Sequence, residues 1–180
     1  ARIRAFQRRP PPENWNGACE AGERFTADDC NNKLIGARWY IEGAVATGPI
    51  HEDEIRSPRD ADGHGTHTAT TAAGMRAEAS IFGTAIGGIE GIAPKARIAA
   101  YKACWLRPGD TRASCNTSDL ANAIDEAVAD GVDVISYSVG SSLTRTTAPD
   151  DLALLAAARA GVIPVVAAGN EGPGFGSIRS

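Results

Sequence analysis

Apolar positions in the second half of the chain alternate between helical spacing and continuous runs. One face of the segment that begins at Ser118 carries apolar side chains three and four residues apart: Leu120, Ala123, Ile124, Ala127 and Val128. This spacing predicts an amphipathic helix, and Gly131 is suited to end it. The apolar run VDVISYSVG follows at once and predicts a strand.

The same order of helix and strand returns about thirty residues later. The segment TAPDDLALLAAARAG begins at a capping candidate, Thr147, and ends at Gly161, and VIPVVAAGN is the next strand. Both strands are apolar almost without alternation, which is typical of parallel strands covered on both faces. We therefore predict an α/β fold whose ligands bind beyond the strand ends, at SVGSS and AAGNEGPG.

The first half of the chain is less regular. Residues 1–33 are rich in turn formers and read as loop, KLIGARWYI predicts a short strand, and 43–62 returns to loop. A helix is expected between Gly63 and a C-terminal stop at Gly74. The run ARIAAYKACW predicts a buried strand, preceded by the glycine-rich lead-in FGTAIGGIEGIAP.

Length and charge narrow the class of protein. The chain has 180 residues, of which 43% are hydrophobic, and a net charge of -4, so it suits one domain or part of a larger one. The mild acidity gives no electrostatic basis for nucleic-acid binding. The longest apolar stretch, Gly161 to Gly169, has the length of a strand and is too short to span a membrane. The first residues do not have the pattern of a signal peptide.

Four cysteines suggest a disulfide framework. Ten residues separate Cys19 from Cys30, and ten separate Cys104 from Cys115. Two polar local loops of equal size favour the pairs 19–30 and 104–115 among three connectivities. Each bridge would stabilise the fold by about 3 kcal/mol, and such bridges are typical of secreted proteins. The alternatives are reduced thiols in a cytosolic protein, or a zinc site, for which no C-x-x-C spacing is present.

Two of the three histidines lie close together in RDADGHGTHTATTAAG. His64 and His67 would share one helix face and could simply pack and be hydrogen-bonded. A metal site is a second interpretation, with Asp60, Asp62 and the acidic residues 51–54 nearby. The spacing of three residues, without a Glu base beside it, is not a zincin pattern.

General-base catalysis is a third interpretation for this histidine pair. His64 would lie in the first turn of the helix, between Gly63 and Gly65. Glycine on either side leaves room for a substrate backbone to approach the imidazole. Taken alone, this segment favours neither a structural role nor a catalytic role for the two histidines.

Five segments together resemble the subtilisin-like serine proteases. GHGTHTATTAAG resembles the histidine motif of that family, and GIAPKARIAAYKACW, DGVDVISYSVG and PVVAAGNEGPG follow in the family's order. The first cysteine loop, WNGACEAGERFTADDCNNKLIGARWY, resembles the branch of plant cucumisin-like enzymes and related secreted bacterial proteases. The resemblance covers about residues 12–176. It implies a three-layer α/β fold with a mostly parallel central sheet, and hydrolysis of polypeptides.

The resemblance also implies a role for each matching residue. His64 matches the catalytic histidine, which takes a proton from the serine hydroxyl, and His67 matches a structural histidine. Asn170 matches the asparagine of the oxyanion hole, although an asparagine at a strand end is also common in turns. Trp105 and Leu106 match one edge of the substrate channel.

Two short segments match the walls of the first substrate pocket, where small side chains let an extended peptide pair with the backbone. Plain packing would select the same small residues. The two walls are Ser138, Val139 and Gly140, and Ala167, Ala168 and Gly169.

Two parts of the family's triad have no counterpart in the sequence. There is no D-T-G for the aspartate and no G-T-S-M-A for the nucleophile, and Ser177 and Ser180 follow Asn170 too closely. We therefore expect residues 1–180 to be a partial catalytic domain, with a loop-rich segment, residues 1–33, and an α/β core, residues 34–180. Remaining segments of the same domain would then be its partners, together with a substrate and a pro-peptide or inhibitor.

Two functions follow from this reading of the sequence. One is a piece of a serine endopeptidase that is inactive alone, and the alternative is a catalytically inactive subtilase-like binding module. An intact pair of His64 and Asn170 favours the first, because a binding module gains nothing from an oxyanion donor. No motif indicates a cofactor, and structural calcium stays open.

Overall fold

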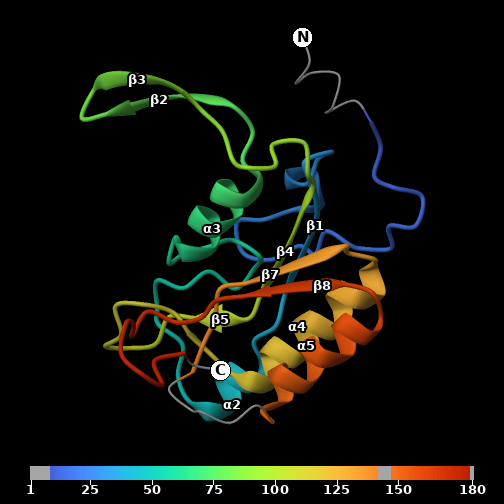
Figure 1. Ribbon diagram of the computed structural model, residues 1–180, viewed down its shortest axis with the longest axis vertical. Helices are drawn as coiled ribbons and strands as arrows, with labels where there is room; N and C mark the ends of the chain where they lie inside the picture. The colour runs from blue at the N-terminus through green and yellow to red at the C-terminus, as the bar shows by residue number, and fades with distance from the viewer. Residues whose placement is uncertain (1–8, 142–146, 179–180) are drawn as a thin grey trace.

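The computed structural model describes residues 9–141 and 147–178 (Figure 1), so Ser180 lies outside the described residues. A 3-10 turn, η1 (Ala27–Asp29), precedes the first strand. The helices and strands that follow are, in chain order, β1 (Leu34–Trp39), α2 (Glu42–Thr47), α3 (His64–Ala73), β2 (Ala77–Ile81), β3 (Thr84–Ile89), β4 (Ile98–Lys102), β5 (Cys104–Trp105), β6 (Ser114–Cys115), α4 (Thr117–Asp130), β7 (Val134–Tyr137), α5 (Pro149–Arg159) and β8 (Ile163–Val166).

Parallel strand pairs form the framework, which confirms the predicted α/β class. β1 pairs with β4, with Trp39 opposite Lys102, and β7 pairs with β8, with Tyr137 opposite Val166. The segment β7–α5–β8 is a βαβ unit, as the repeated helix and strand pattern predicts. Within the described residues the hydrogen-bonded sheets are two-stranded, so the central sheet consists of separate pairs.

Helices α4 and α5 pack against each other and supply most of the larger cluster of buried hydrophobic side chains (Figure 1). The apolar face of α4 is buried as its spacing predicts, and it meets Tyr137 of β7 and Ala103 beside β4. Full burial of a leucine or isoleucine side chain stabilises a fold by about 1.5–3 kcal/mol. Gly131 ends α4 with a φ of 90°, a conformation that glycine adopts without a steric penalty.

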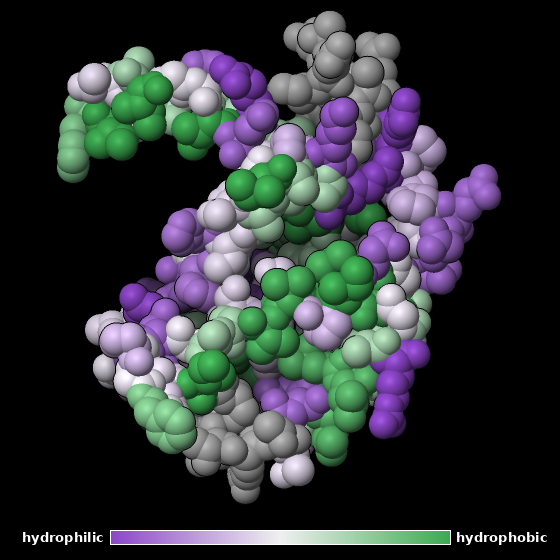
Figure 2. Space-filling model, in the orientation of Figure 1, coloured by the Kyte–Doolittle hydropathy of each residue, from purple (hydrophilic) through white to green (hydrophobic). Residues whose placement is uncertain are grey.

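The other face of the β7–β8 pair is open, although apolar strands predict cover on both faces. Side chains on that face are strongly exposed: Val134 at 52%, Ile163 at 61% and Val165 at 57%. Figure 2 shows a broad hydrophobic surface in this region of the molecule. Apolar side chains of parallel strands are normally covered, so this face lacks the layer that the strand pattern predicts.

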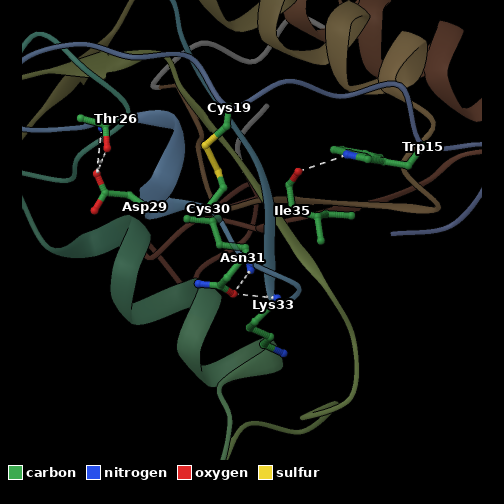
Figure 3. The surroundings of a disulfide bond; sticks show 9 residues. Trp15, Cys19, Thr26, Asp29, Cys30, Asn31, Lys33 and Ile35 are labelled. Carbon is green, nitrogen blue, oxygen red and sulfur yellow. Dashed lines mark hydrogen bonds between the residues drawn. A yellow bond between two sulfur atoms is a disulfide. The ribbon is translucent and has the colours of Figure 1, made fainter. Parts of the chain in front are cut away.

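Residues 9–33 are loop-rich, as predicted, and are held against β1 (Figure 3). A disulfide joins Cys19 and Cys30, and the indole Nε1 of Trp15 donates a hydrogen bond of 3.1 Å to the carbonyl oxygen of Ile35. The backbone of Cys19 also forms an isolated parallel β-bridge with Ala37 of β1. The disulfide and these contacts hold an otherwise irregular segment against the first strand.

The second disulfide joins Cys104 to Cys115, which lie opposite each other in the β5–β6 ladder. Both pairings match those that the equal loop lengths favour. No helix in the described part of the chain is long and apolar enough to cross a membrane.

The structure differs from the sequence prediction in the glycine-rich lead-in. Its first half forms β3, which pairs with β2, immediately before it in the sequence, as an antiparallel hairpin that projects from the body (Figure 1). Phe82 and Gly83 both have positive φ at its turn, as tight hairpin turns require.

Two helix starts also differ from the prediction. Helix α2 lies in the predicted loop 43–62, because the buried Asp119 accepts hydrogen bonds from the Gly43 and Ala44 amides at its start. Helix α5 begins after Ala148 and not at the predicted cap Thr147, since Pro149 is its first residue.

Candidate functional site

His64 is the first residue of α3, where the sequence predicts it. The preceding Gly63 has a φ of 91°, which glycine adopts without strain. An ideal Cβ on Gly63 would contact nothing, so the left-handed backbone, and not crowding, favours glycine here. The His64 side chain is exposed, so its imidazole is accessible from solvent.

Asp60 fastens the loop before α3 to the first turn of the helix. Its carboxylate accepts hydrogen bonds from the Gly63 amide at 2.8 Å and the Thr66 amide at 2.7 Å. The Thr66 hydroxyl donates a further bond at 2.7 Å. Burial acts to raise the pKa of Asp60, but these hydrogen bonds outweigh it and hold the pKa below its usual value. Asp60 therefore stays ionised and caps the turn that carries His64.

The C-terminal end of α3 is also fixed, by the segment GIA. The amides of Gly91, Ile92 and Ala93 donate to the carbonyl oxygens of Gly74, Thr71 and Ala72, in that order. A Cβ on Gly91 would lie 2.4 Å from the Gly74 nitrogen, so only glycine fits this close approach. The helix is held at both ends.

His67 lies one turn after His64 on the same helix. Its side chain is exposed, and therefore the described residues do not give it the buried contact that a structural role would use. The family-derived structural role of His67 stays a prediction.

The ends of β7 and β8 bring together the two predicted pocket walls. The Ala167 amide donates a hydrogen bond of 3.0 Å to the Tyr137 carbonyl oxygen, at the last residue of β7. Ser138–Gly140 and Ala167–Gly169 therefore leave the sheet side by side. Asn170 follows the second segment, with its side chain exposed and its backbone amide bonded to the Glu171 carboxylate at 2.9 Å. This is the edge where parallel sheets bind ligands.

The predicted channel edge at Trp105 and Leu106 is only partly suited to that role. Trp105 is fully buried, and its indole donates a hydrogen bond of 2.7 Å to the Tyr40 carbonyl oxygen. Its side chain therefore belongs to the core, which corrects the expectation for this residue. Leu106 is partly exposed and can still lie at an edge.

The structure joins the two wall segments to each other by a backbone hydrogen bond, from Ala167 to Tyr137 at the end of β7. In the described part of the chain, the hydrogen bonds of α3 run to the preceding loop and to residues 91–93. These hydrogen bonds do not connect His64 to Asn170. The sequence prediction that His64 and Asn170 act on one substrate stays a prediction.

Sequence reasoning missed the ion pair between Glu54 and Lys102, with Nζ and Oε1 2.7 Å apart. Glu54 belongs to the acidic residues 51–54, considered above for a metal site, but its carboxylate is committed to Lys102. Within residues 9–141 and 147–178, no three His, Cys, Asp or Glu side chains are grouped to hold a metal ion. A lysine inside the apolar run ARIAAYKACW was the signal, because a buried lysine needs a partner.

Asp60→Ala should weaken the start of α3 by an amount typical of a lost helix cap, about 0.5–2 kcal/mol. The pKa of Asp60 is lower in the folded protein than in the unfolded chain. Its contribution to the free energy of unfolding is therefore complete above the unfolded pKa and is lost as the pH falls through the folded pKa. The measurement is the thermal midpoint of the complete protein by circular dichroism. The difference in thermal midpoint between Asp60→Ala and the unmodified protein should be largest at pH 7 and should become smaller only below about pH 4.

Asp62→Ala is the control for this prediction, since its carboxylate makes none of the bonds to Thr66. An equal loss of stability in both variants would contradict the capping role of Asp60.

Comparison with known proteins places the chain in a family. Residues 42–180 match the family described as the Subtilase family. The chain is 48% identical over 179 residues to Subtilisin-like protease SBT3.13 of Arabidopsis thaliana, covering 92% of this chain and 23% of that protein. It is 48% identical over 174 residues to Subtilisin-like protease SBT1.7 of the same plant, covering 94% of this chain and 22% of that protein.

Two solved structures are also similar. Sphericase is 35% identical with a TM-score of 0.47, over 64% of this chain and 34% of that chain. The structure titled S41 Psychrophilic Protease is 34% identical with a TM-score of 0.45, over 62% of this chain and 33% of that chain. The match to the two plant proteases covers less than a quarter of the length of each of those proteins. From the match over residues 42–180 and the identity to the plant proteases, the chain belongs to the subtilase family.

Proposed function

We propose that residues 1–180 are the central part of the catalytic domain of a secreted subtilisin-like serine endopeptidase. The observation that carries the proposal is the family's H-G-T-H sequence at the exposed, capped start of α3, inside the segment that matches the family. The two disulfides support secretion, because such bridges persist in oxidising compartments.

His64 acts as the general base in this proposal. The imidazole accepts the proton of a serine hydroxyl as that oxygen attacks the peptide carbonyl, and then donates it to the leaving amine. The serine and the aspartate that orients the imidazole come from segments outside residues 1–180, since neither motif is in this sequence. Asp60 and the amides of residues 91–93 support this role by holding both ends of α3.

Asn170 stabilises the tetrahedral intermediate. Its side-chain amide donates to the negative oxygen that forms from the carbonyl. The residues before it, Ala167 to Gly169, and the facing segment Ser138–Gly140 form the walls along which the substrate lies as an added strand. The exposure of Ser138, Gly140 and residues 167–169 at the paired ends of β7 and β8 supports this arrangement.

The open face of the β7–β8 pair supports the view that further segments complete the domain. Val134, Ile163 and Val165 expose apolar surface that another layer would bury. The relatives extend well beyond the matched region, which leaves ample chain for that layer. Residues 1–180 alone are expected to be inactive.

The test is hydrolysis of casein and a chromogenic peptide by the complete protein, secreted from a plant host. We expect activity that a serine-directed sulfonyl fluoride abolishes and that the zinc chelator 1,10-phenanthroline leaves intact. Residues 1–180 expressed alone should give no hydrolysis. A complete protein that folds but cleaves neither substrate would favour an inactive binding module, and activity that depends on added zinc would contradict the serine mechanism.

A further inference from the structure

We infer that the buried pair of Lys102 and Glu54 is a positioning device that holds the His64 loop and the Leu106 edge in one geometry. This inference rests on the proposed function, because it assigns the pair a role through His64. Lys102 and Glu54 would touch neither substrate nor the reacting atoms. They would act by fixing the backbone that carries those groups.

Lys102 uses all three of its donors on one loop. Its Nζ donates to Glu54 Oε1 at 2.7 Å, to the Ile55 carbonyl oxygen at 3.0 Å and to the Arg59 carbonyl oxygen at 2.7 Å. The ammonium also lies 4.2 Å from the centre of the Trp105 ring, close enough for a cation–π contact. Lys102 is the last residue of β4, a strand paired with β1, so the loop is tied to a rigid element.

Glu54 extends the same connection to the predicted channel edge. One carboxylate oxygen, Oε1, binds Lys102, and the other, Oε2, accepts the Leu106 amide at 2.8 Å. The Glu54 side chain is 1% exposed, so water cannot replace either bond. A single buried carboxylate therefore joins Leu106 to the loop that leads to His64.

The path from the ion pair to His64 is short and consists of hydrogen bonds. Arg59, whose carbonyl oxygen accepts from Lys102, is followed directly by Asp60. Asp60 in turn binds the Gly63 and Thr66 amides on either side of His64. Loss of the Lys102 bond would leave the Arg59 carbonyl oxygen without this donor, so the adjacent Asp60 and the start of α3 could shift. A displacement of about 1 Å at a reacting group can cost about 100-fold in rate.

A second ion pair provides a matched comparison. Asp130, whose side chain is 4% exposed, binds Arg38 through both carboxylate oxygens at 2.8 Å. This pair joins β1 to the last residue of α4, and Asp130 also accepts a hydrogen bond of 2.7 Å from the Tyr101 hydroxyl of β4. Among the described residues, neither Arg38 nor Asp130 is hydrogen-bonded to α3 or to Leu106. Both carboxylates are buried, paired with a cation and bonded at each oxygen. They differ in the segments that they connect, because only the pair of Glu54 and Lys102 is bonded to Arg59 and Leu106.

The experiment compares Glu54→Gln with Asp130→Asn in the complete protein. Each amide keeps the shape but has one acceptor oxygen, so it cannot replace a carboxylate bonded at both oxygens. Steady-state kinetics on a chromogenic peptide are measured per folded molecule, with active sites counted by a serine-directed reagent. We expect Glu54→Gln to lower kcat/KM about 10- to 100-fold more than Asp130→Asn, with kcat reduced through His64 and KM raised through Leu106.

Lys102→Arg and Arg38→Lys form a second matched pair if Glu54→Gln does not fold. Both keep the charge, but a planar guanidinium cannot reproduce the three bonds of the Lys102 ammonium. Lys102→Arg should therefore lose more kcat/KM than Arg38→Lys. Equal losses within each pair would overturn the positioning role. His64→Ala is run alongside: if it stays active, the proposed function fails, and if it is inactive while the pairs match, only the present inference fails.

Discussion

Replacing His64 by alanine in the complete protein should abolish nearly all peptide hydrolysis while leaving the fold intact. Loss of a triad residue in a subtilisin costs roughly 10⁶-fold in kcat, and the same loss is expected here. The reason is that without the imidazole no group takes the proton from the serine hydroxyl as it attacks. His64 is exposed at the start of α3, so its removal leaves no buried cavity.

His67→Ala is the matched control for this prediction, because it removes the same kind of side chain from the same helix one turn away. It should keep most of the turnover, since its role in the family is structural. The measurements are kcat on a chromogenic peptide and circular dichroism of each variant. A folded His67→Ala protein without activity, or a His64→Ala protein that retains it, would reverse the assignment of the two histidines.

The regular elements of the second half were predictable from local pattern alone. The spacing from Leu120 to Val128 and the stop at Gly131 placed α4 within a residue of its observed bounds. These positions obey a repeat that hydrophobic burial imposes on any helix packed against a sheet. The start of α3 was equally visible, because Gly63 and Gly74 bracket it in sequence.

Two of the missed features, helix α2 and the ion pair of Glu54, depend on partners distant in sequence. Helix α2 is capped by Asp119, which accepts a hydrogen bond from the Ala44 amide, 75 residues earlier in the chain. No local sequence pattern predicts a hydrogen bond over that distance. In the sequence Glu54 belongs to an acidic cluster, whereas in the structure it is paired with Lys102, 48 residues later. The hairpin β2–β3 was obscured because its glycines weaken the alternation that marks a strand.

The candidate site was predicted from motifs more than from physics. Nothing in the spacing of His64 alone separates a catalytic from a packed histidine, and the family resemblance decided between them. The structure adds what the motif lacks, namely the Asp60 cap and the close approach of Gly91 to the end of α3. Trp105 shows the limit of the motif, because a residue matched to a channel edge is fully buried.

Replacing Asn170 by leucine should lower kcat and leave KM almost unchanged. The attacked carbonyl carries a full negative charge only in the tetrahedral intermediate, so an amide aimed at its oxygen stabilises the transition state more than the bound substrate. Leucine keeps the volume and removes the donor. For the corresponding asparagine of a subtilisin the measured loss is about 10²–10³ in kcat, and we expect that range in the complete protein.

The position of Asn170 makes this test specific. It follows β8 immediately after Gly169, which has a φ of 90°, and its backbone amide is bonded to Glu171, so the turn does not depend on the Asn170 side chain. Glu171→Gln is the control, since it keeps an acceptor for that amide and should leave kcat near its original value. Steady-state kinetics on a chromogenic peptide, with the fold checked by circular dichroism, separate the outcomes. An unchanged kcat would contradict the oxyanion role, and a change confined to KM would make Asn170 a substrate-binding residue.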